Sequence, residues 1–168
     1  MPTQRTSSLL GQSFQAISHF LRQGLADEDS RELREHLGEL SQQIEVLVAA
    51  RRSRAPAPGL QQQAQALAQQ MRAHQYYLTG LGAAWHALYE MDAYQRALHT
   101  LRQALDAWLQ ALAQHELQEA RLFQQFEQRA WRTLGEAMLL VDMYEQGDTL
   151  HSEAAAPAPL KPWWRRWL

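Results

Sequence analysis

Cysteine is absent from this chain, lysine occurs once, and β-branched residues are few. Without cysteine the chain can form neither a disulfide nor a thiolate metal site, and nothing in it indicates an oxidising compartment. No apolar run approaches the ~20 residues that a membrane-spanning helix needs. The first residues lack the charged segment followed by a long apolar segment that marks a signal peptide. We therefore expect a cytoplasmic protein.

The formal net charge of −2 conceals an uneven distribution. Residues 1–152 carry 13 arginines and 17 acidic residues, whereas residues 153–168 carry three basic groups and one acid. Duplex binding usually requires a strongly basic face. The mildly acidic body of the chain therefore excludes nucleic acid as an expected partner.

Apolar residues recur with the 4-3 spacing that places them along one face of a helix. Three such stripes are Leu33, Leu37, Leu40, Ile44 and Leu47, then Leu60, Ala64, Leu67, Met71, His74, Leu78, Leu81, Trp85 and Leu88, then Tyr94, Leu98, Leu101, Leu105, Trp108 and Leu112. A later series in a shifted phase is Leu122, Phe123, Phe126, Ala130, Leu134, Met138, Val141 and Tyr144. The sequence predicts an all-α protein, a four- to five-helix bundle of long, heptad-patterned antiparallel helices with a flexible C-terminal tail.

Proline, glycine and capping residues predict where these helices end. Pro56 and Pro58 predict an internal linker over residues 54–59, because proline cannot continue a helix. The stripe that follows predicts one helix of about 30 residues. Asp92 is expected to cap the next helix, and Gly147 to stop the last one.

Two features leave the helix count open. A short helix is expected over residues 14–25, before a turn rich in acidic residues. Residues 93–146 form either one long helix or two helices with a tight break near 113–118, and matched helix lengths favour the break.

The sequence divides the chain into four parts. A flexible N-terminus covers residues 1–12, and the helical bundle covers 13–147 with its internal linker at 54–59. An Ala/Pro-rich linker covers residues 148–162, and a Trp/Arg-rich terminal peptide covers 163–168.

The terminal peptide is the most specific feature of the sequence. Three of the six tryptophans lie in the last six positions, and the peptide reads Trp163, Trp164, Arg165, Arg166, Trp167 and Leu168. Trp and Arg are enriched at binding hot spots, so one interpretation is a docking peptide for a groove on another protein. A second is weak attachment to an anionic membrane surface, since Trp prefers the headgroup region. A third is that the peptide folds back onto its own bundle.

Histidine and arginine provide the remaining candidate sites. His74 falls in a core stripe, where a polar residue can fix the register of the helices or act as a pH-sensitive switch. The pairs Glu32/His36, His86/Glu90 and His115/Glu119 have the i, i+4 spacing of ligands on one helix face, but they are too few for a metal site. The cluster Arg51, Arg52 and Arg54 predicts either a contact with phosphate or with an acidic partner, or a solvated helix end.

A set of aromatic residues, Tyr76, Tyr77, Trp85, Tyr89 and Tyr94, predicts either a ligand pocket or core packing. No phosphate-binding loop, nucleophile elbow or catalytic Cys/His pair is present, so we expect no enzymatic activity, no metal and no cofactor.

We expect a bacterial, non-enzymatic adaptor or accessory subunit, chaperone- or scaffold-like, that binds another protein through its terminal peptide and a bundle face. Apolar stripes on several helices also favour self-association through helix faces. A peripheral membrane protein anchored by its tail at the inner leaflet is the alternative. A ligand- or metal-binding bundle built around His74, His86 and Tyr77 is a third hypothesis.

Overall fold

A computed structural model describes residues 28–152 of the chain. Over this range the chain forms five α-helices and no strand, so the all-α prediction is confirmed. The helices are α2 (Glu28–Arg52), α3 (Ala57–Thr79), α4 (Ala83–His86), α5 (Tyr89–Ala113) and α6 (Glu119–Ser152). The expected helix over 14–25, the Ala/Pro linker from residue 153 onward and the terminal peptide lie outside the described residues.

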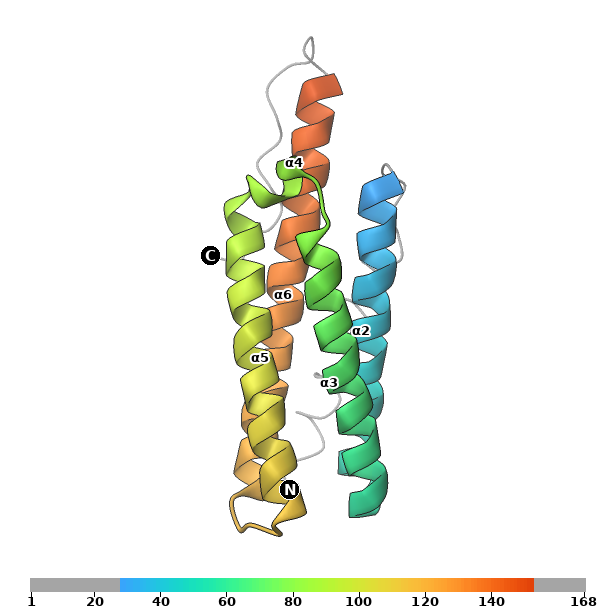
Figure 1. Ribbon diagram of the computed structural model, residues 1–168, viewed down its shortest axis with the longest axis vertical. Helices are drawn as coiled ribbons and strands as arrows, with labels where there is room; N and C mark the ends of the chain where they lie inside the picture. Colours follow the sequence, from blue (N-terminus) through green and yellow to red (C-terminus); the bar gives the residue numbers. More distant parts are fainter. Residues whose placement is uncertain (1–27, 153–168) are drawn as a thin grey trace, which may run out of the picture.

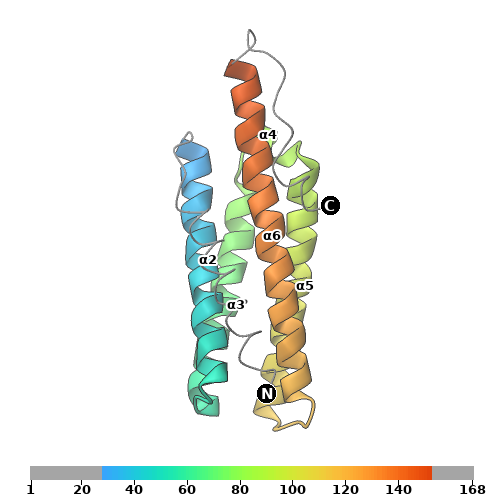
Figure 2. The ribbon, with the colours of Figure 1, turned by 180° about the vertical axis from the view of Figure 1, so that it is seen from behind.

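The four long helices form a bundle in which each packs against two others. The contacting pairs are α2 with α3, α3 with α5, α5 with α6, and α2 with α6. Figure 1 shows the chain running down α2, up α3, down α5 and up α6, with α6 extending beyond its neighbours at one end. Figure 2 shows the same arrangement from behind, with α2 and α3 on one side and α5 and α6 on the other.

The apolar stripes of the sequence form the core. All five apolar residues of the α2 stripe are fully buried, and so are Leu98, Leu101 and Leu105 of α5. On α6 the buried positions include Ala137 and Leu140, while the predicted Met138 is only partly buried. The burial of these side chains stabilises the helices, since isolated helices of this length are marginal in water.

The prediction of one 30-residue helix after the linker is wrong. Helix α3 ends at Thr79, with Gly80 as its C-cap, and Gly82 has an extended backbone with ψ of 165°. Glycine is unfavourable in a helix by about 1 kcal/mol relative to alanine, and two glycines in three residues favour a break. The single turn of α4 then returns Trp85 to the core, where its ring stacks on that of Tyr144 at 3.5 Å. This return kept the stripe in phase across the break.

Other helix ends also differ from the predictions. Helix α3 begins at Ala57 with a proline in its first turn, so the helix extends into the predicted linker 54–59. A proline is compatible with a first turn because its missing N–H has no partner there. Helix α5 begins at Tyr89 without a side-chain cap, so Asp92 does not cap it. Helix α6 continues through Gly147 to Ser152, and no described glycine has the positive φ of a helix-stopping cap.

The break near residues 113–118 is present. Helix α5 ends at Ala113 and α6 begins at Glu119, with His115 in the left-handed region at φ 52°. A left-handed residue cannot continue a right-handed helix, so α5 ends here and the chain turns back toward α6 (Figure 1). Residues 93–146 therefore belong to two helices.

Ion pairs connect the first and the last of the described helices. Arg34 of α2 donates two hydrogen bonds to the Glu145 carboxylate of α6, at 2.8 and 2.7 Å, and the Ser30 hydroxyl donates a third at 2.6 Å. Arg51 forms a two-point contact with Glu119, both at 2.7 Å, and Arg52 reaches Glu127 at 3.4 Å. Because the three pairs are spread along α2, they fix its position along α6.

None of the helices between residues 28 and 152 combines the length and apolar character needed to cross a bilayer.

Replacing the fully buried Leu37 by alanine should lower the free energy of unfolding by roughly 2–5 kcal/mol, because the cavity cannot fully close. Leu117→Ala is the matched control, since Leu117 is 103% exposed, and should change the same quantity by less than about 0.5 kcal/mol. Urea denaturation followed by circular dichroism measures both. Equal losses in the two variants would contradict the assigned core.

Candidate functional site

The six residues of the terminal peptide, from Trp163 to Leu168, lie outside the described residues. Their assignment as a partner-binding element therefore stays a prediction. The residues that can be placed are His74, the histidine–carboxylate pairs, the aromatic set and the arginine cluster.

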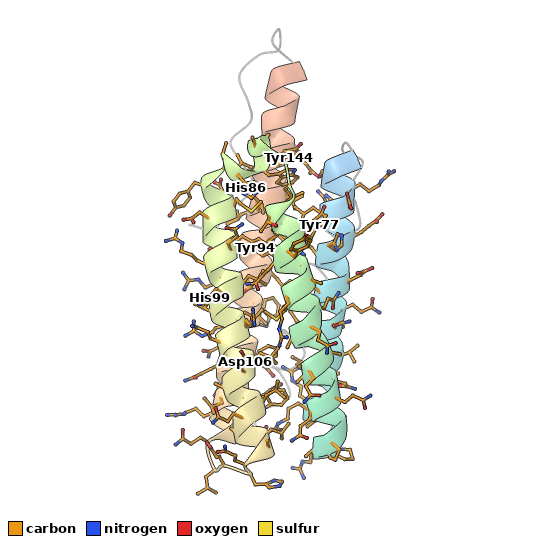
Figure 3. All side chains as sticks on the ribbon, viewed as in Figure 1. Tyr77, His86, Tyr94, His99, Asp106 and Tyr144 are labelled. Atoms are coloured by element: carbon orange, nitrogen blue, oxygen red, sulfur yellow. The ribbon has the colours of Figure 1, made fainter. Side chains whose placement is uncertain are left out.

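His74 lies in the core, 3% exposed, at a point where three helices meet. Its Nε2 forms a 2.6 Å hydrogen bond with the hydroxyl of Tyr94 on α5. On α3 itself, Tyr77 stacks against the ring of His36 of α2, with ring centroids 4.0 Å apart. Figure 3 shows Tyr77 and Tyr94 on their two helices at a similar height in the bundle.

Burial determines the protonation state of this cluster. Desolvation, with a smaller contribution from the charge of His36, lowers the pKa of His74 to about 4. Burial also raises the pKa of the Tyr94 phenol above its ordinary value. Both side chains are therefore neutral near pH 7, and the contact is a neutral hydrogen bond in an apolar core. His74 Nδ1 has no hydrogen-bond partner among the described residues.

A hydrogen bond at one level of an apolar core favours a single alignment of α3 against α5, since sliding either helix would leave both polar groups buried without partners. This geometry suits the register-setting role predicted for His74. A switch near neutral pH does not fit a histidine whose pKa is about 4.

The histidine–carboxylate pairs do not assemble into a metal site. His115 lies in the loop before α6, so His115 and Glu119 do not share a helix face. Glu119 instead accepts hydrogen bonds from Arg51 and from the indole N–H of Trp108. No group of three or more histidine or acidic side chains within residues 28–152 is arranged to hold a metal ion.

The aromatic set is divided between core and surface, so it does not form one pocket. Trp85 and Tyr94 are fully buried, and Tyr77 is partly buried. Tyr76 and Tyr89 are 82% and 74% exposed, on different helices. His86, the other residue of the third hypothesis, is exposed on α4 (Figure 3).

The arginine cluster is partly paired within the bundle and partly exposed at the helix end. Arg51 and Arg52 form ion pairs with carboxylates of α6, and Arg52 and Arg54 are exposed. The Arg51 hydrogen bonds lower the pKa of the Glu119 carboxyl. Only Arg54 of the three lies outside these ion pairs, exposed in the turn at a positive φ of 57°.

A groove of about 400 Å³ follows the outer seam between α5 and α6. It is lined by Tyr89, Ala93, Arg96, Ala97, Thr100, Arg129, Arg132 and Glu136. Small side chains of α5 form its partly buried floor, and the three arginines and the tyrosine are exposed. Arg96 pairs with the exposed Asp92 at 3.1 Å, whereas Arg129 and Arg132 form no ion pair with another described residue. The groove therefore presents guanidinium groups from two helices.

A second groove, of about 420 Å³, follows the outer seam between α2 and α3. Its lining residues are Glu39, Gln42, Gln43, Val46, Gln63, Ala66 and Gln70. Val46 is 49% exposed, and the side-chain carbonyl of Gln70 is buried without a hydrogen-bond partner among the described residues. This groove offers amides and an apolar contact, with no arginine.

Sequence reasoning missed both grooves. Arg129 and Arg132 have the i, i+3 spacing of neighbours on a helix face, which is a weak signal. Whether an arginine is open to a partner depends on carboxylates far away in the sequence, as Arg51 and Glu119 illustrate.

The free energy of unfolding of the wild type should fall by roughly 3 kcal/mol through His74 alone as the pH is lowered from about 6.5 to 4. In this range the unfolded state binds a proton at His74 and the folded state does not. A His74→Leu variant should lack this component, whereas His86→Leu, at an exposed position, should retain it. Urea denaturation at several pH values measures the difference between the variants. Parallel pH profiles for wild type and His74→Leu would contradict the assignment.

Comparison with protein-family models, curated proteins and solved structures gives no significant match to this chain. A proposal for its function therefore rests on its own residues.

Proposed function

We propose that this chain is a non-enzymatic adaptor, a helical scaffold that binds other proteins through the α5–α6 groove and through its Trp/Arg-rich terminal peptide. The observation that carries the proposal is the groove itself. Arg96, Arg129 and Arg132 are exposed around a floor of small residues, on two helices that pack closely together.

The chemistry of this groove suits a protein partner. Arginine and tyrosine are enriched at interface hot spots, because each covers a large area and donates directed hydrogen bonds. The guanidinium groups of Arg129 and Arg132, which form no ion pair with another described residue, favour carboxylates on the protein that binds there. The lining of the groove is mostly charged and polar, whereas small-molecule sites are lined mainly by apolar and aromatic side chains.

The bundle supports this role as a rigid frame. We interpret its core as heptad-type packing between antiparallel neighbours, which holds the groove in one shape. The three α2–α6 ion pairs and the His74–Tyr94 hydrogen bond favour a single alignment of the helices. A preorganised surface loses less conformational entropy on binding than a mobile one.

The terminal peptide provides the second contact in this proposal. Its tryptophans and arginines are residue types that are enriched at binding hot spots. The sequence before them contains several prolines, which is typical of a spacer. Two separate contacts on one chain are what an adaptor requires, because they can hold two components together.

The test immobilises the full chain and identifies the proteins that it retains, with two variants in parallel. Trp163→Ala/Trp164→Ala/Trp167→Ala should lose proteins held by the tail, and Arg129→Ala/Arg132→Ala should lose proteins held by the groove. Helix content by circular dichroism should stay unchanged in both variants, since the replaced arginines are exposed and outside the α2–α6 ion pairs. If neither variant changes the set of retained proteins, the adaptor proposal is wrong.

Liposome co-sedimentation separates this proposal from membrane attachment. Full-length protein should not pellet with anionic vesicles at physiological salt. Pelleting that requires residues 153–168 and disappears at high salt would instead assign the tail to the membrane surface.

A further inference from the structure

The α2–α6 contact neutralises some charged side chains of the bundle and leaves others exposed. Its three ion pairs engage three arginines of α2 and three glutamates of α6. Charges that are neutralised at this contact are not available to a partner. The charge that each helix presents to solvent therefore differs from the charge of its sequence.

The charges outside these pairs are mostly acidic on α2 and mostly basic on α6. On α2, among side chains that the structure describes, they are Arg31, Glu32, Glu35, Glu39 and Glu45. On α6 they are Arg121, Arg129, Arg132, Glu136 and Asp142. Arg96 of α5 adds a third guanidinium beside Arg129 and Arg132 in the groove, although Asp92 partly offsets it.

The α2–α3 groove and the α5–α6 groove lie on opposite sides of the molecule. Helices α2 and α3 form one side of the bundle, and α5 and α6 form the other, as both views show (Figures 1 and 2). Glu39 lines the α2–α3 groove, and Glu32 and Glu35 are exposed on the preceding turns of α2. The surface of α2 at the first groove thus carries open carboxylates, and the second groove carries open guanidinium groups.

We propose that the α5–α6 groove binds the α2–α3 side of a second copy of this chain, so that the bundles assemble side by side. The inference rests on the proposed function of the groove as a protein contact and names its partner. The terminal peptide then remains available for a different component.

Each side of the bundle carries a groove between two helices, of about 400 Å³ between α5 and α6 and about 420 Å³ between α2 and α3. A ridge from one copy can enter the groove of the next while the α2–α3 groove receives a ridge in return. Glu35 and Glu39 are about 6 Å apart along α2, and Arg129 and Arg132 are about 4.5 Å apart along α6, so the charges can face one another.

Because the contacting surfaces are different patches on opposite sides, each copy can bind one neighbour on each side. Such a heterologous contact produces an open row or a closed ring, and it does not stop at a symmetric dimer. Exposed ion pairs are individually weak and are screened by salt, so the assembly should be concentration-dependent and should require low ionic strength.

Charge reversal on either surface tests the pairing. The groove variant is Arg129→Glu/Arg132→Glu, and the face variant is Glu35→Arg/Glu39→Arg. All four residues are exposed and form no ion pair with a described residue, so the fold should tolerate the changes. The matched control is Arg54→Glu/Arg72→Glu, with the same change in charge as the groove variant at exposed positions outside both grooves.

Sedimentation velocity over a concentration series at low and high salt gives the result. Wild type and control should associate at about 20 mM NaCl, and at about 500 mM NaCl the association should weaken by about tenfold or more. Each reversed variant alone should remain monomeric, because its two sides then carry charges of the same sign. An equimolar mixture of the two variants should associate again, since each supplies the surface that the other needs.

Three outcomes overturn the inference: monomeric wild type throughout the low-salt series, association that both reversed variants retain, or a mixture that does not recover association. Failure here leaves the adaptor proposal standing if Arg129→Ala/Arg132→Ala still loses a retained protein in the capture experiment. In that case the groove binds an acidic surface of another protein. Failure of both experiments removes the groove from any binding role.

Discussion

Arg34 lies in the contact between α2 and α6 with only 6% of its surface exposed, and a guanidinium so buried requires a carboxylate. Glu145 accepts two hydrogen bonds from it near the far end of the described chain, 111 positions away. Removing one partner of such a pair leaves the other as an uncompensated buried charge. This costs far more than replacing both partners by apolar residues. The Arg34–Glu145 pair therefore favours the alignment of α2 and α6 in which these two side chains meet.

A second contact, inside the core, also favours one alignment of the helices, and its physical basis is different. The His74–Tyr94 contact is neutral, because burial keeps both groups uncharged near pH 7. The Arg34 contact is charged and lies at the edge of the core. One joins α3 to α5, and the other joins α2 to α6, so each acts on a different pair of helices. An apolar core alone would tolerate helix sliding, since methyl groups pack in several alignments, whereas unpaired polar groups penalise it.

Much of the core could be predicted from the sequence, because apolar periodicity depends only on neighbouring residues. The stripe from Leu33 to Leu47 is buried as its spacing indicates. The break at Gly80 was missed for an instructive reason, since the single turn of α4 returns Trp85 to the phase that an unbroken helix would give. The arginine cluster at the end of α2 was misread because its partners in α6 are 68 and 75 positions away. The α5–α6 groove could not be predicted for the same reason. Whether a charged side chain is available to a partner depends on which charges far away in the sequence already pair with it.

The order of the helices along the chain has a consequence for synthesis. The contacts of α2 with α3, α3 with α5, and α5 with α6 all join consecutive long helices and form with little loss of loop entropy. The α2–α6 contact spans the whole described chain, and α6 is the last of these helices to leave the ribosome. Until Glu119 and Glu145 emerge, a nascent chain holds Arg51 and Arg34 without their carboxylates and exposes the apolar faces that α6 will cover. Among the described helices, the last to be translated is thus the one whose glutamates pair with the arginines of the first.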